Sequence, residues 1–137
     1  MKRILFTLMA VLVASVSCFA QNDTLRVLAI GNSFSDDAVE EHLHALAKAE
    51  GLTLIIGNIY KAGCSIERHV NYLRGDVADY EFRKISAEGV RTIEYGYTMA
   101  RGLANEEWDY VSFQQGSAFS GIPESYALLP ELVEYVK

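Results

Sequence analysis

Short aliphatic runs alternate with a segment of helical spacing in the first half of the chain. Residues 25–30 and 52–56 are nearly all aliphatic, which is typical of short strands buried on both faces. Residues 37–48 between them predict a helix, because apolar side chains recur there at the spacing i, i+4, i+7 and i+8. This apolar face consists of Val39, Leu43, Leu46 and Ala47. The order strand, helix, strand predicts a β-α-β unit with two parallel strands.

The second half of the chain predicts further helices and strands. The expected elements are a helix capped by Ser65, a β-hairpin over residues 80–95, a short helix over 98–104, a strand over 110–114 and a last helix after Pro130. Apolar and polar residues alternate in the segments YEFRKIS and VRTIEY, which flank the turn residues AEG. We expect this hairpin to be inserted between α/β units. The last helix has no capping glycine and no return strand, and three strands leave poorly covered sheet edges. We therefore expect the front part of a longer domain.

The first twenty residues have the layout of a secretory signal peptide. A basic start precedes an apolar stretch over residues 4–16, and small residues end the segment at Ala20. The apolar stretch is shorter than the about 20 residues that a membrane helix needs. We therefore predict cleavage after Ala20, a periplasmic or extracellular location and no membrane span after cleavage. A lipid anchor on Cys18 is less favoured, because Ser15 stands where such sites usually have an aliphatic residue.

The remaining chain, residues 21–137, has the size of one small domain. Its lysines and arginines are scattered and the net charge is −6, so no electrostatic footprint for nucleic acid exists. Cys64 is the single cysteine after cleavage, which excludes an internal disulfide. His42 and His44 stand at i and i+2 of the predicted helix and do not share a face, which argues against a metal site. We expect no cofactor.

Three predicted strand ends are followed by polar loops that contain glycine: GNSFS, KAGCS and QQGSAFS. Sites in parallel sheets form beyond the carboxyl ends of the strands, so we expect these loops to meet. Ser33 stands at a strand-to-helix corner, where unpaired N–H groups favour an oxyanion. Gly63 can supply a second backbone N–H, and Gln114 or Gln115 a side-chain amide. The alternative is that all four residues serve only turns, caps and packing.

The segments VLAIGNSFSDD, NIYKAGCS and DYVSFQQGS resemble, in order and spacing, the first three blocks of the SGNH (GDSL-like) hydrolases. The likeness is greatest to a secreted branch with GNSFS at the nucleophile. The resemblance implies a flavodoxin-like three-layer α/β sandwich with a parallel central sheet. It also implies that Ser33 is the nucleophile and that Gly63 belongs to the oxyanion hole.

The chain departs from this family pattern in three places. Asn32 stands where many members have aspartate. Residues 116–118 read GSA in place of the family's Gly-x-Asn, so Gln114 or Gln115 is the expected replacement for the missing asparagine donor. No Asp-x-x-His follows Ser117, and a serine hydroxyl is a weak nucleophile without a neighbouring base.

The resemblance implies an exported serine esterase or acyl hydrolase that acts through an acyl-serine intermediate. The expected substrate is a small-molecule or glycan ester, for example an O-acetylated carbohydrate, and the chain alone is expected to be inactive because its base is missing. The alternative is a non-catalytic module that binds a carbohydrate or acyl group at the same edge. Cys64 is expected to be a packed loop residue rather than a reactive thiol. All three histidines, His69 included, lie outside the family's base position.

Overall fold

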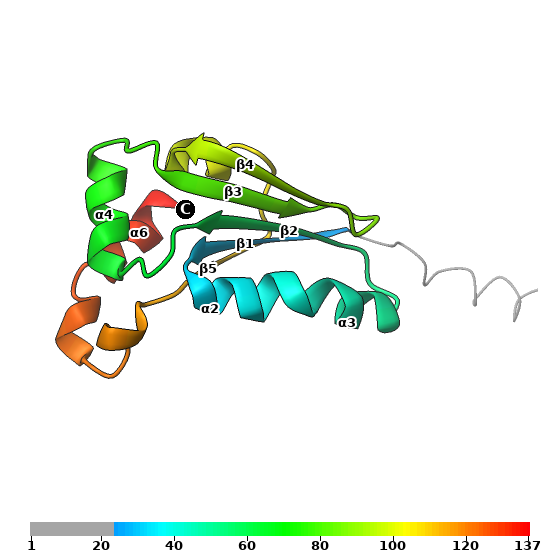
Figure 1. Ribbon diagram of the computed structural model, residues 1–137, viewed down its shortest axis with the longest axis horizontal. Helices are drawn as coiled ribbons and strands as arrows, with labels where there is room; N and C mark the ends of the chain where they lie inside the picture. The colour runs from blue at the N-terminus through cyan, green and yellow to red at the C-terminus, as the bar shows by residue number, and fades with distance from the viewer. Residues whose placement is uncertain (1–23) are drawn as a thin grey trace, which may run out of the picture.

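The computed structural model describes residues 24–137, so the predicted signal peptide and Cys18 lie outside the described residues. Five strands form one sheet in the order β4-β3-β2-β1-β5 (Figure 1). The strands are β1 (Leu25–Gly31), β2 (Leu54–Tyr60), β3 (Tyr80–Ile85), β4 (Arg91–Tyr97) and β5 (Tyr110–Phe113). Within the described residues no helix has the length and apolar character to cross a membrane.

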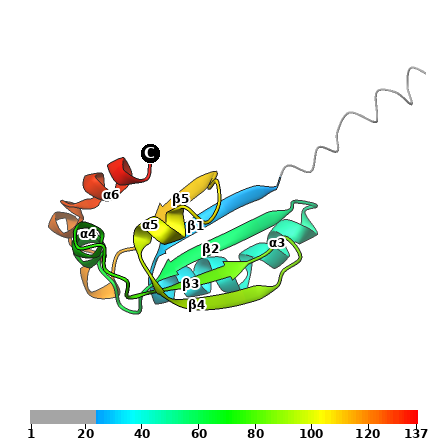
Figure 2. The ribbon, with the colours of Figure 1, turned by 90° about the horizontal axis from the view of Figure 1, so that it is seen from above.

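Helical segments cover both faces of the sheet and one of its ends. They are α2 (Ser33–Ser35), the π-helix η1 (Asp36–Glu41), α3 (Leu43–Ala49), α4 (Ile66–Arg74), α5 (Met99–Leu103), the 3₁₀ turns η2 (Ser117–Phe119) and η3 (Pro123–Tyr126), and α6 (Leu129–Tyr135). The segments α2, η1 and α3 run along one face as a nearly continuous rod (Figure 1). Both α4 and α6 lie beyond the ends of β1 and β2 (Figure 1, Figure 2).

The sheet is mixed, so the predicted parallel, flavodoxin-like central sheet is wrong. Strand β1 pairs in parallel with β2 and β5, whereas β3 pairs antiparallel with both β2 and β4. The reason lies in the path of the chain after β2. Helix α4 stands at the end of the sheet and does not return across a face, so β3 starts where β2 finishes. Tyr60, the last residue of β2, therefore faces Glu81, the second residue of β3. The hairpin extends the sheet instead of interrupting an α/β series.

Two hydrophobic clusters lie on opposite faces of the sheet. The larger one joins the strands to α4, α5 and α6, and its fully buried members include Leu28, Ile59 and Leu132. The smaller one joins β1, β2 and β3 to the η1–α3 rod through Val39 and neighbouring aliphatic side chains. With both faces covered, the buried strands present aliphatic side chains in both directions, which explains their unbroken apolar runs.

The first helical segment begins at Ser33, four residues earlier than the sequence predicts, because Asn32 is its N-cap. The wider π-helical turn then rotates the residues that follow, and Leu46, expected in the apolar face, is 63% exposed. The predicted cap at Ser65 is confirmed, since its hydroxyl accepts a hydrogen bond from the amide of Arg68.

Candidate functional site

Ser33 occupies the corner between β1 and α2 at the end of the sheet where the parallel strands finish. Its side chain is exposed, and its hydroxyl makes no hydrogen bond to any other described residue. The backbone amide of Ser33 is likewise unpaired within residues 24–137, because the capping oxygen of Asn32 accepts from Phe34 instead. The corner thus presents a free hydroxyl and a free N–H group to solvent.

Asn32 joins the three loops that follow β1, β2 and β5. Its side-chain amide donates to the carbonyl oxygens of Cys64 at 2.8 Å and Gln115 at 3.2 Å. Its Oδ1 accepts from the amide of Phe34 at 3.1 Å, and the residue is only 1% exposed. The prediction that these loops meet is therefore confirmed. The same contacts explain why asparagine stands here, since an ionised aspartate has no N–H to donate.

Gly63 lies in the second loop with its backbone at φ +61°, a conformation that favours glycine. It is exposed, and a Cβ at this position would meet no atom within 4 Å, so the space beside it is open. Its amide donates no hydrogen bond to the described residues. The next residue, Cys64, is tied to Asn32, which places the free amide of Gly63 in the loop that contacts the Ser33 corner.

The two candidate glutamines differ in their surroundings. Gln115 is buried; its Oε1 accepts from the amides of Ile66 and Gly116, both at 2.9 Å, and its Nε2 donates to Ser125. This side chain is fully engaged in holding the second and third loops together. Gln114 donates to the hydroxyl of Ser112 at 3.2 Å, and its buried Oε1 has no partner among the described residues. Of the two, Gln114 alone has hydrogen-bonding capacity left.

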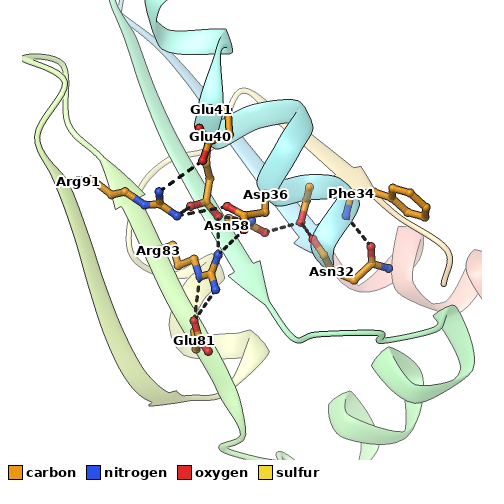
Figure 3. Close-up of polar contacts among 10 residues, drawn as sticks. Asn32, Phe34, Asp36, Glu40, Glu41, Asn58, Glu81, Arg83 and Arg91 are labelled. Atoms are coloured by element: carbon orange, nitrogen blue, oxygen red, sulfur yellow. Dashed lines mark hydrogen bonds and ion pairs between the residues drawn. The ribbon is translucent and has the colours of Figure 1, made fainter. Parts of the chain in front are cut away.

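A buried polar chain connects the Ser33 segment to β2. The hydroxyl of Ser35 donates to the carbonyl oxygen of Asn32 at 2.7 Å and contacts Oδ1 of Asn58 at 3.0 Å. The amide of Asn58 then donates to Glu40 at 2.6 Å (Figure 3). Ser35 and Asn58 are fully buried, and the Glu40 side chain is 1% exposed.

Two arginines of the β3–β4 hairpin complete this network. Arg91 pairs with Glu40 and, at 3.2 Å, with Asp36 (Figure 3). Arg83 lies 3.2 Å from Asp36 and 3.6 Å from Glu40. Burial raises the pKa of Glu40, and the hydrogen bond from Asn58 and the two arginine charges oppose that increase. The network ties the π-helix that follows Ser33 to β2 through Asn58, to β3 through Arg83 and to β4 through Arg91.

Sequence reasoning missed this network entirely. One signal was present: Asn58 is a polar residue inside the otherwise apolar strand LIIGNIY. A buried amide needs partners for both its N–H and C=O groups, so it indicates polar side chains on the covering helix. The two arginines carry no comparable signal, because charged residues in an alternating hairpin are usually solvated.

Within residues 24–137, none of the three histidines makes a hydrogen bond to Ser33. His69 is fully buried, contacts the hydroxyl of Tyr80 at 2.9 Å, and has its pKa lowered to about 4 by burial and by the charge of Arg68. His44 contacts the carbonyl oxygen of Ala87 at 3.2 Å, so it packs on the turn of the β3–β4 hairpin. His42 is exposed on the rod, and its side chain makes no hydrogen bond to the described residues.

Cys64 is buried, as expected for a packed loop residue. Burial raises the pKa of its thiol to about 11, so the reactive thiolate is scarce at neutral pH. Across residues 24–137, no group of three His, Cys, Asp or Glu side chains is arranged to hold a metal ion. A cavity of about 40 Å³ lies between the second and third loops, lined by Ser65, Glu67, Gln115, Phe119 and Ser125. It has room for about one water molecule.

Comparison with known proteins gives one family and one structure. The profile described as "Domain of unknown function (DUF4886)" matches residues 26–137. No curated protein matches. The crystal structure of a DUF4886 family protein from Bacteroides uniformis ATCC 8492 is similar to this chain, with 54% identity and a TM-score of 0.80. The match covers 83% of this chain and 44% of the other, so this chain spans less than half the length of that relative.

Proposed function

We propose a serine hydrolase function for this chain, which belongs to the DUF4886 family. The reaction is ester hydrolysis through an acyl-serine intermediate, with Ser33 as the nucleophile. One observation carries the proposal. Asn32 binds the loops after β2 and β5 and leaves the adjacent Ser33 hydroxyl exposed beside unpaired backbone amides. The resemblance of the same three loops to the SGNH hydrolase blocks supports this reading.

The proposed oxyanion hole uses backbone N–H groups. When a serine attacks an ester carbonyl, negative charge develops on the carbonyl oxygen, and preorganised donors stabilise it. The amides of Ser33 and Gly63 are free to donate, and the open space beside Gly63 leaves room for a substrate atom. Gln114 is the candidate for a third donor, because its Nε2 donates to Ser112 alone and keeps a second N–H group, whereas Nε2 of Gln115 donates to both the carbonyl oxygen and the hydroxyl of Ser125.

The proton acceptor is proposed to come from outside the described residues. His69 is neutral and bonded to Tyr80, and neither His42 nor His44 contacts the Ser33 corner. The longer chain of the Bacteroides uniformis relative supports the proposal that the complete protein supplies this base. We also propose that the protein is exported through its signal peptide and acts on an esterified glycan or small molecule.

The test compares Ser33→Ala with Ser117→Ala in the complete gene product. Ser117 is an exposed serine of the third loop whose hydroxyl has no hydrogen-bond partner among the described residues, so it is a matched control. We expect Ser33→Ala to lower the rate of p-nitrophenyl acetate hydrolysis by about 10³-fold or more, with Ser117→Ala unchanged. A fluorophosphonate should label Ser33 covalently, and peptide mass spectrometry detects the label. Hydrolysis that survives Ser33→Ala would refute the proposal.

A non-catalytic binding module is the second candidate, favoured by the lack of a free histidine beside Ser33 among residues 24–137. It predicts that the complete protein binds an acetylated oligosaccharide without turnover and that a fluorophosphonate neither labels Ser33 nor blocks binding. Isothermal titration calorimetry before and after phosphonate treatment separates the two candidates, because binding by a non-catalytic module should be unchanged.

A further inference from the structure

We propose that Arg83 and Arg91 of the β3–β4 hairpin are positioning residues for the nucleophile. They fix the helical segment that begins at Ser33 and thereby set the place of its hydroxyl. This inference rests on the proposed role of Ser33. It gives a function to the antiparallel half of the sheet, which lies beside the parallel strands that carry the loops of the site.

Buried polar side chains link Ser33 to β2. The peptide that carries Ser33 is held on one side by the cap at Asn32 and on the other by the buried hydroxyl of Ser35. That hydroxyl contacts Asn58, whose amide donates to Glu40 at 2.6 Å. The orientation of Asn58 therefore depends on where Glu40 holds its carboxylate.

Glu40 is linked in turn to the β3–β4 hairpin. Arg91 on β4 pairs with both Glu40 and Asp36, so it spans the whole π-helical turn (Figure 3). Arg83 on β3 approaches the same two carboxylates. Its guanidinium is in turn fixed by Glu81 at 2.8 Å and by the ring of Tyr60, whose centroid lies 3.5 Å away. The Arg83 side chain is thus anchored to the sheet before it reaches the helix.

The helical segment after Ser33 has few buried apolar side chains to hold it. A π-helical turn is rare and occurs mostly as a single turn inside a helix, frequently at a functional site. Val39 is the single buried apolar side chain of η1, and no residue of α3 is buried. Apolar packing therefore leaves the beginning of the rod weakly held. Each arginine contacts both Asp36 and Glu40, and such charge-assisted contacts are directional, so they supply the missing orientation.

The experiment uses the complete gene product and compares Arg91→Gln with Arg91→Lys and Arg74→Gln. Arg74 is an exposed arginine that pairs with Glu131 between α4 and α6, so it controls for loss of an ion pair elsewhere. We expect Arg91→Gln to lower kcat for p-nitrophenyl acetate by about 10- to 100-fold, with KM within about twofold of the wild type. Arg91→Lys should recover part of the loss, and Arg74→Gln should have no effect.

A structural readout accompanies the kinetics. Amide hydrogen exchange at residues 35 and 36 should become at least about tenfold faster in Arg91→Gln, with exchange in β1 unchanged. If Arg91→Gln does not fold, the double variant Glu40→Gln/Arg91→Gln carries the same readouts, because it leaves no unpaired buried charge. We expect its melting temperature to recover while kcat stays about tenfold or more below that of the wild type.

The outcomes separate this inference from the proposed function. Absence of ester turnover in the wild type would overturn both. Turnover in the wild type that is unchanged in a folded Arg91→Gln, or unchanged in the double variant, would overturn the positioning role alone. Unchanged exchange at residues 35 and 36 would do the same.

Discussion

The side-chain amide of Asn32 donates a hydrogen bond of 2.8 Å to the carbonyl oxygen of Cys64, 32 residues further along the chain. The same amide reaches the carbonyl oxygen of Gln115. One buried, uncharged side chain thus ties together the loops that follow β1, β2 and β5. The geometry of this edge depends on N–H donors that a carboxylate cannot replace.

Asn32→Asp should therefore destabilise the fold. The new carboxylate would face two carbonyl oxygens in a site that is 1% exposed, and we expect the free energy of unfolding to fall by about 2–4 kcal/mol. Urea denaturation measures the change. The control is Asn105→Asp, an exposed position whose side-chain oxygen accepts from Lys84 and would still do so as a carboxylate. Equal stability of the two variants would contradict this account of Asn32.

Gly31→Ala tests the close packing beneath the Ser33 corner. A Cβ at Gly31 would lie 2.1 Å from Oε1 of Gln114 and 2.8 Å from Cβ of Ser35, so both side chains must move. We expect a loss of about 1–3 kcal/mol in the free energy of unfolding. Gly121→Ala is the matched control, since a Cβ there meets no atom within 4 Å. If Gly31→Ala were as stable as Gly121→Ala, Gln114 and Ser35 would be able to move aside at no cost, and this account of the packing would be wrong.

His69 should make stability depend on pH. Burial, together with the charge of Arg68, lowers its pKa to about 4 in the folded protein, whereas the unfolded chain has a value of about 6.5. Between these values the unfolded chain binds the proton and the folded protein does not. The free energy of unfolding therefore decreases as pH falls from about 6.5 to about 4, by roughly 3 kcal/mol in total.

Urea denaturation at several pH values checks this prediction in His69→Gln, which keeps a polar atom near Tyr80. The variant should lose this part of the pH dependence, and His42→Gln, at an exposed position, should keep it. An identical slope in the two variants would exclude His69 as the source.

Cys64 should react slowly while the protein is folded. Burial raises the pKa of its thiol to about 11, which makes the thiolate scarce at pH 8, and the side chain is shielded from solvent. We expect iodoacetamide to modify Cys64 at least about tenfold more slowly in buffer than in 8 M urea. Peptide mass spectrometry follows the modification. Comparable rates in the two conditions would indicate that the loop opens readily.

Much of the fold was predictable from residue patterns, because those patterns report local geometry. The aliphatic run of residues 25–30 falls on β1, the strand predicted over residues 110–114 corresponds to β5, and Ser65 caps α4 as its position suggests. The contact among the three loops at Asn32 was also predictable from the sequence, because the end of a parallel strand determines where the loop after it begins. The position of Ser33 at an exposed corner was likewise predictable from a strand followed by a helix.

The tertiary structure alone decided three other features. Alternation in residues 80–95 predicts a hairpin, but the path through α4 determines that β3 runs antiparallel to β2. Gln114 and Gln115 are chemically identical, and only the positions of neighbouring loops decide which one is fully bonded. The network of Arg83, Arg91 and Glu40 joins segments far apart in the chain. Sequence periodicity determines which face a side chain occupies, whereas its partner depends on how distant segments pack.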